Sequence, residues 1–105
     1  MITTLVQFKL PEALTKEKAK EVFLSTAPKY TSVSGLLRKQ YLISEDGRTA
    51  GGVYLWKTRE AAELLFTNEW RKFVVDKYGS EPVISWFVTP VIVDNEIGKI
   101  SFDGQ

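Results

Sequence analysis

Hydrophobic and polar positions alternate along residues 2–10, which predicts a strand near the start of the chain. Strand-like runs recur at 35–44, 49–57 and 83–93, and the last of these is rich in β-branched and aromatic residues. Residues 45–48 read Glu-Asp-Gly-Arg, which predicts a hairpin connection, because glycine tolerates the positive φ that such turns require. The second and third strands are therefore expected to pair antiparallel.

Two segments between these strands carry apolar residues at helical spacing. Thr15 is the predicted cap of the first helix, which ends near Pro28. Thr58 is the predicted cap of the second, which continues by a further turn or two until Gly79. The order βαββαβ predicts the ferredoxin-like α+β arrangement, with an antiparallel four-stranded sheet and both helices on one face. We expect a single domain over residues 1–105.

The predicted strands are apolar or aromatic on both faces, so the sheet face away from the helices is unsuited to water. A second copy of the same sheet is the simplest cover, which predicts a homodimer. Residues 91–105 remain strand-like after the four-stranded unit is complete, and we interpret them as an arm over the partner; an untethered tail is the alternative. Gly51 and Gly52 predict a bulge or a close backbone approach in the third strand.

The composition of the chain excludes several kinds of catalytic and metal site. The 105 residues include no cysteine and no histidine, which excludes thiolate nucleophiles, disulfides and histidine bases, and leaves no usual ligand for zinc, copper or haem. The net charge of +1 argues against nucleic acid and anionic membranes as partners. Residues 1–10 read as a strand rather than a signal peptide, and no run approaches the ~20 apolar residues of a spanning helix. We expect a cytoplasmic protein with no metal and no cofactor.

Three segments together resemble a known family: Gly-Leu-Leu-Arg-Lys at 35–39, Ala-Gly-Gly-Val-Tyr-Leu-Trp at 50–56, and the helix at 58–65. They are similar to the YdhR-like monooxygenases of the dimeric alpha-beta barrel superfamily. The resemblance extends to the antibiotic biosynthesis monooxygenases, small homodimers with a ligand cavity between sheet and helices. It implies oxidation of an activated aromatic substrate without metal or flavin.

Three residues are the predicted catalytic group. By the resemblance, Trp56 corresponds to an aromatic residue that lines the cavity, and Tyr54 projects from the same face of the strand, so the two would sandwich an aromatic ring. Lys39 is the candidate that stabilises an anionic oxygen, because a lysine on an apolar sheet face is costly without a partner or a lowered pKa. Structural roles stay open for all three: core or interface aromatics for Trp56 and Tyr54, and a snorkelling or paired lysine, for example with Glu81, for Lys39.

Five further residues are predicted to bind the substrate. Arg38 competes with Lys39 from the opposite face of the same strand, Asn68 and Trp70 would close the pocket mouth, and Gln7 would orient a carbonyl. Tyr41 completes the set. Trp70 also fits a purely structural place on an amphipathic helix.

Three functions of different kinds follow from these residues. The first is a cofactor-independent monooxygenase acting on a small aromatic or quinol-like compound. The second is an isomerase or cyclase, which would move protons without oxygen. The third is a non-catalytic ligand-binding or assembly domain, in which the Lys39→Met substitution leaves binding intact and can raise stability.

Overall fold

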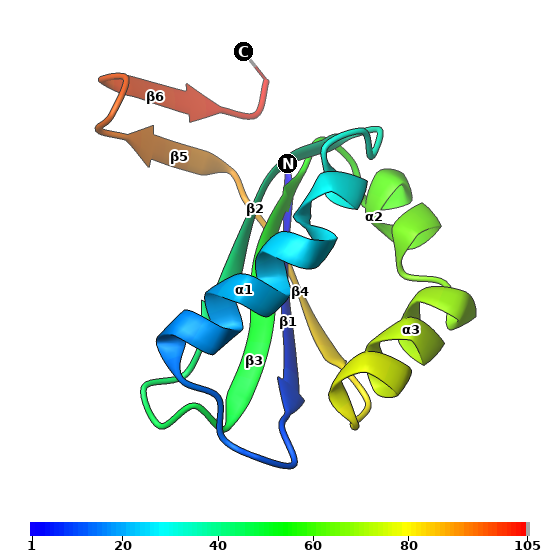
Figure 1. Cartoon of the computed structure of the whole chain (residues 1–105). Coiled ribbons are helices and arrows are strands. Elements are labelled where there is room, and N and C mark those ends of the chain that lie inside the picture. The colour runs from blue at the N-terminus through cyan, green and yellow to red at the C-terminus, as the bar shows by residue number, and fades with distance from the viewer. Residues whose placement is uncertain (105) are drawn as a thin grey trace.

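The alternating segments form one antiparallel sheet in the computed structural model, which describes residues 1–104 (Figure 1). The sheet has the strand order β2-β3-β1-β4 and consists of β1 (Ile2–Lys9), β2 (Leu36–Ile43), β3 (Thr49–Trp56) and β4 (Val83–Val88). The two central strands are β1 and β3, and all helices lie on one face of the sheet. The expected ferredoxin-like fold is confirmed.

Short polar side chains begin each helix. Thr15 precedes α1 (Lys16–Thr26) and Thr58 precedes α2 (Arg59–Leu65), and each hydroxyl accepts a backbone N–H three residues ahead, as predicted. A 3-10 helix, η1 (Ala27–Tyr30), continues α1.

The second predicted helix is divided in two. The backbone leaves the helical region at Phe66, and the Thr67 hydroxyl accepts the Trp70 N–H at 3.2 Å, which begins a new helix, α3 (Asn68–Tyr78). The prediction of one continuous helix was therefore wrong. Thr67 acts as a second N-cap and begins a separate helix. Gly79, with φ of 91°, ends α3 as expected.

The last predicted strand is also divided. The strand β4 ends at Val88, before Pro90, which has no N–H to continue the ladder. Beyond it, β5 (Val91–Asp94) and β6 (Lys99–Phe102) form a separate hairpin that extends away from the main sheet (Figure 1).

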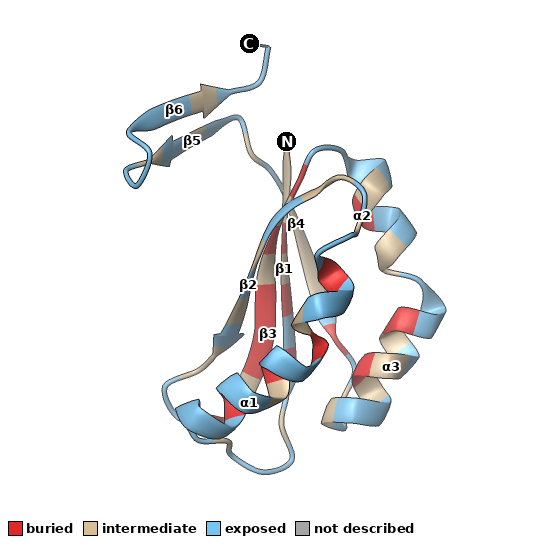
Figure 2. Ribbon diagram, turned by 45° about the horizontal axis from the view of Figure 1, so that its top comes forward, coloured by how far each residue is buried: buried red, intermediate tan, exposed pale blue. Residues whose placement is uncertain are grey.

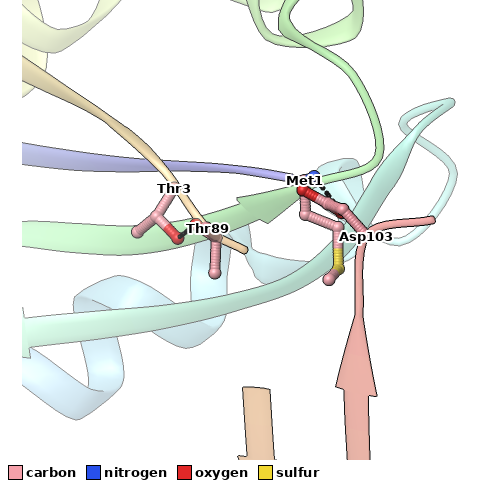
Figure 3. Close-up of polar contacts among 4 residues, drawn as sticks. All are labelled: Met1, Thr3, Thr89 and Asp103. Carbon is pink, nitrogen blue, oxygen red and sulfur yellow. Dashed lines mark hydrogen bonds and ion pairs between the residues drawn. The ribbon is translucent and has the colours of Figure 1, made fainter. Parts of the chain in front are cut away.

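Polar contacts hold this hairpin to the start of the chain. The Met1 ammonium donates to Asp103 Oδ1 at 2.7 Å, and the Thr3 and Thr89 hydroxyls hydrogen-bond where the chain leaves β4 (Figure 3). The exposed Met1–Asp103 ion pair contributes little to stability. The hairpin is an appendage of the four-stranded unit.

The core lies between the sheet and the helices. Buried positions follow one face of β1 and β3 and meet the inner sides of α1 and α3 (Figure 2). The opposite sheet face is only partly covered: Leu5, Val53 and Leu55 are half-buried, whereas Val83 and Phe87 are more than half exposed. The apolar second face predicted from the strand pattern is therefore present.

Gly51 faces the backbone of β1 at a place that leaves no room for a side chain. A Cβ atom at Gly51 would lie 1.8 Å from the Val6 carbonyl oxygen, whereas one at Gly52 would lie 3.1 Å or more from its neighbours. The expected close approach is found, and the irregular strand pairing lies in β2, between Leu36 and Arg38, instead of at the glycine pair.

We predict that Gly51→Ala lowers the free energy of unfolding by about 1–3 kcal/mol, because the β1 backbone must shift to admit the methyl group. Gly52→Ala is the matched control and should cost less. Urea denaturation of both variants measures the difference. Equal stability of Gly51→Ala and the wild type would contradict the packing described.

Candidate active site

The side chain of Lys39 ends among tyrosine rings on the helix side of the sheet. Its Nζ lies 3.4 Å from the ring centroid of Tyr30, 3.7 Å from that of Tyr41 and 4.8 Å from that of Tyr54. These rings come from η1, β2 and β3, so three elements build the enclosure. Within residues 1–104, no carboxylate forms an ion pair with Lys39. The amine is held by aromatic faces alone.

Burial, with a smaller contribution from the positive charge of Lys29, lowers the pKa of Lys39 from 10.5 to about 7. The aromatic faces favour the ammonium form, but the loss of hydration on burial is the larger effect. Near neutral pH the group therefore exists in both protonation states. It can stabilise an anionic oxygen as an ammonium and accept a proton as a free amine.

This pKa predicts a pH-dependent stability difference between the wild type and Lys39→Met. The unfolded chain keeps a proton on Lys39 up to its ordinary pKa of 10.5, whereas the folded chain releases it from about 7 upward. Since the unfolded state then binds more protons, the wild type gains stability with rising pH between these values. Urea unfolding at pH 6 and pH 9 should show the variant's advantage shrinking at pH 9. An advantage that is the same at both pH values would contradict the lowered pKa.

Three tyrosines of the inner site, Tyr41, Tyr54 and Tyr78, remain protonated at neutral pH. Burial raises the pKa of Tyr41 and Tyr54 above the ordinary range, and raises that of Tyr78 to about 12. Tyr41 Oη is 2.8 Å from the Thr26 hydroxyl, and Trp70 Nε1 donates to Tyr30 Oη at 3.1 Å. The phenols of Tyr41 and Tyr54 therefore keep their protons near neutral pH and do not act as bases.

Two spaces meet at Lys39. The inner cavity, between sheet and helices, holds about 20 Å³, enough for one water-sized molecule. An open groove of about 390 Å³ lies next to the inner cavity, and Tyr30, Lys39 and Tyr41 line both spaces. The groove falls within the size range of small-molecule sites, whereas the inner cavity is too small for an aromatic ring. The Lys39 side chain and its two tyrosine neighbours form the wall between them.

Four of the residues predicted from sequence come together here: Lys39, Tyr41, Tyr54 and Trp70 all line the inner cavity. Trp56 lies behind Tyr54. Its ring stacks on Tyr54 at 5.9 Å with an interplanar angle of 3°, and its Nε1 donates to Thr4 Oγ1 at 3.0 Å. It is fully buried and lines neither the cavity nor the groove. The structure therefore places Trp56 as a support for the cavity wall.

The remaining predicted residues lie apart from the inner cavity. Gln7 is on the opposite sheet face, in a hollow that it shares with Glu81, so Glu81 is not the partner of Lys39. Arg38 also points to that side, reaches the outer edge of the groove and pairs with Asp94 at 3.4 Å. Asn68 is exposed at the first position of α3. Strand alternation separates Arg38 and Gln7 from Lys39.

Sequence reasoning missed Tyr30, Tyr78 and Thr26 as site residues. Tyr30 follows Pro28 in a segment expected to be a loop, and Tyr78 lies at the end of α3. Both line the inner cavity, so all four tyrosines of the chain meet there. In a chain without histidine or cysteine, the small set of tyrosines was the one signal that pointed to these positions.

Residues 1–104 contain no group of three acidic side chains placed to hold a metal ion. Among the helices described, none combines the length and the apolar character needed to cross a membrane.

The fold is shared with solved oxygenase structures. The monooxygenase ActVA-Orf6 of Streptomyces coelicolor, solved with nanaomycin D, aligns over 89% of this chain and 90% of its own, with 18% identity and a TM-score of 0.68. SnoaB, a cofactor-independent oxygenase of Streptomyces nogalater, aligns over 90% and 97%, with 16% identity and a TM-score of 0.63. An antibiotic biosynthesis monooxygenase of Deinococcus radiodurans, itself assigned as putative, aligns over the same shares with 10% identity and a TM-score of 0.65.

At these identities, the likeness shows the fold alone. No curated protein matches the chain in sequence. The model of the family described as "Putative mono-oxygenase ydhR" matches residues 4–79, about three quarters of the chain, and the chain belongs to this family.

Proposed function

We propose that the protein is a cofactor-independent monooxygenase that oxidises a small aromatic or quinol-like compound at the Lys39 site. Membership of the mono-oxygenase family and the shared fold support a monooxygenase-like function. The observation that carries the finer proposal is the Lys39 amine, enclosed by three tyrosine rings between an inner cavity and an open groove.

In this proposal the substrate supplies the electrons. Lys39 Nζ, as a free amine, takes the proton of an activated methylene or phenol, and the resulting ammonium stays beside the negative charge. Oxygen then adds to the electron-rich carbon, and the hydroperoxide loses water to leave a carbonyl. The balance is R₂CH₂ + O₂ → R₂C=O + H₂O. Neutral tyrosine hydroxyls hydrogen-bond the substrate oxygen, and the aromatic walls exclude bulk water.

An aromatic substrate requires room that the inner cavity lacks. We infer that the substrate ring enters from the groove and displaces the Lys39 side chain. This displacement joins the groove and the inner cavity into one space. A lysine side chain has enough rotatable bonds for this movement, and no ion pair within residues 1–104 holds it. The aromatic faces of Tyr30 and Tyr41 would then contact the ring in place of the ammonium.

Tryptophan fluorescence offers a direct binding test, because Trp70 lines the inner cavity and donates to Tyr30. Anaerobic titration with phenols, hydroquinones and anthrones should give saturable quenching that is lost in Trp70→Phe. Trp86→Phe is the control: Trp86 packs under Arg59 at 4.2 Å and lines neither space. Quenching that persists in Trp70→Phe, or no quenching by any compound, would contradict binding at this site.

We further propose that the protein is a homodimer in which the open sheet face covers its counterpart. Phe87 and Val83 are exposed on this face, and Val91, Val93 and Ile100 are exposed on the hairpin, which we propose to be an arm that reaches over the second copy. Burying two such apolar surfaces in one contact is favourable.

We predict that Phe87→Glu converts the dimer to a monomer, because it places a charge in the proposed interface. Leu64→Glu is the matched control, since Leu64 is 81% exposed on α2 and away from that face. Light scattering coupled to size-exclusion chromatography measures the masses. A monomeric wild type, or a dimer that survives Phe87→Glu, would contradict the proposal.

A proton-moving isomerase or cyclase is the second candidate. The observation that favours it is the same amine, which can exchange a proton near neutral pH. Turnover without oxygen separates the two functions.

A further inference from the structure

Lys39 is unusual among the basic groups of this chain because it combines burial with the lack of an acidic partner. Its neighbours around Nζ are ring faces, and Lys29, whose charge helps to lower the pKa of Lys39, is also positive. Lys29 itself lies 3.5 Å from the ring centroid of Phe73. Nothing near Nζ within residues 1–104 therefore holds the proton in place by an ion pair.

The Lys39 side chain also borders a space that is open to solvent. It forms part of the wall of the groove of about 390 Å³, whose other lining includes apolar Leu36, Leu37 and Ala27. A flat apolar molecule of the size of a benzene ring fits such a groove, and its reactive atom can approach Nζ along the shared wall. The groove thus brings a free amine, an apolar surface and a path from solvent together.

An enclosed amine of this kind has nucleophilic chemistry that the proton transfer proposed above does not use. A lysine in water has a pKa of about 10.4, so only on the order of a thousandth is unprotonated near neutral pH. Lys39, with a pKa of about 7, is mostly free amine at pH 7.5. Desolvation of a lysine in an apolar pocket is a general way to activate it toward carbonyl compounds.

We propose that Lys39 is also a nucleophilic residue that forms a reversible imine with small aromatic aldehydes entering through the groove. The Nζ lone pair forms a bond to the carbonyl carbon while the carbonyl π pair moves to oxygen. The nitrogen loses two protons in succession, the oxygen gains two and leaves as water, and a C=N bond remains. The balance is R–NH₂ + O=CH–Ar → R–N=CH–Ar + H₂O, with no oxidant or reductant. Tyr30, which lines the groove, carries a hydroxyl that is suited to donate to the carbonyl oxygen.

Reductive trapping tests this activity. The wild-type protein is incubated with benzaldehyde and cyanoborohydride at pH 7.5, and intact mass and peptide mapping report the number and place of the labels. We expect Lys39 to be labelled on the order of a hundred times faster than any other lysine, and label on the Met1 α-amine, a group that reacts with aldehydes near this pH, is counted separately by the peptide map. Its rate should rise through a midpoint near pH 7. Lys39→Arg keeps a cation and should lose this label, whereas Lys72→Arg, on the exposed face of α3, should keep it.

Labels spread over exposed lysines, or a label at Lys39 that appears only near pH 10, would overturn the inference. Peptide mapping of the wild type gives this answer even if a variant fails to fold. Trapping needs no oxygen and no oxidisable substrate, so its outcome is independent of the oxygenase test. If Lys39 is labelled specifically but no oxygen is consumed, the oxygenase proposal fails and the imine-forming activity of Lys39 stands.

Discussion

Lys39→Met is expected to lower oxygen-dependent turnover by about 10²–10³-fold while the protein stays folded. The substitution removes the proton acceptor and the positive charge that would face the developing anion, and it keeps a flexible apolar side chain of similar length. The same change should raise the free energy of unfolding at pH 6, because a buried ammonium without an acidic partner is lost. Rate measurements with an oxygen electrode and urea denaturation check the two parts.

Lys72→Met is the matched control for that experiment. Lys72 is exposed on α3, 76% accessible, and pairs with Asp76 at 2.8 Å. Its removal should leave turnover unchanged. A Lys39→Met protein that is folded and as active as Lys72→Met would show that the reaction does not use this amine.

Trp56→Ala is expected to lower the free energy of unfolding by about 3–5 kcal/mol. The indole is fully buried, stacks on Tyr54 and meets the Phe66 ring edge-on at 5.8 Å, so its loss leaves a large cavity between the end of β3 and the helices. Thr4 Oγ1 would also lose its donor. Urea denaturation with a signal from backbone circular dichroism measures the change without relying on tryptophan emission.

Trp56→Phe separates packing from hydrogen bonding. It keeps a ring against Tyr54 and removes the N–H to Thr4, so it should cost clearly less than Trp56→Ala. A stable Trp56→Ala protein that loses only ligand binding would instead make Trp56 a direct contact of the ligand, contrary to its position here.

The local features of the fold were predictable because short segments of sequence encode them. Thr15 and Thr58 cap their helices through contacts three residues away, and Asp46-Gly47 forms the hairpin turn, with Asp46 Oδ1 accepting the Arg48 N–H at 3.0 Å. The divisions at Thr67 and Pro90 were also local, but in each case an apolar run continued past the interruption. The prediction followed the apolar run in both places and therefore did not end the helix at Thr67 or the strand before Pro90.

The site was predictable only in part, because its assembly depends on long-range pairing. Strand alternation alone places Lys39 and Tyr41 on one face and Arg38 on the other, which the structure confirms. The depth of Trp56 follows from the central position of β3 and from Phe66 covering it, which no local pattern reveals. Tyr30 and Tyr78 reach the cavity from a 3-10 turn and a helix end, where neither helical nor strand period applies.

The central claim is that the protein oxygenates its substrate without a metal or flavin. Oxygen uptake with an anthrone, measured after dialysis against a chelator and removal of any flavin, tests this claim most directly. The account predicts one O₂ consumed and one carbonyl product formed per substrate, with ¹⁸O from labelled oxygen in the product and a rate that depends on Lys39. Turnover that continues without oxygen, or that starts only when a metal or flavin is added, would contradict it.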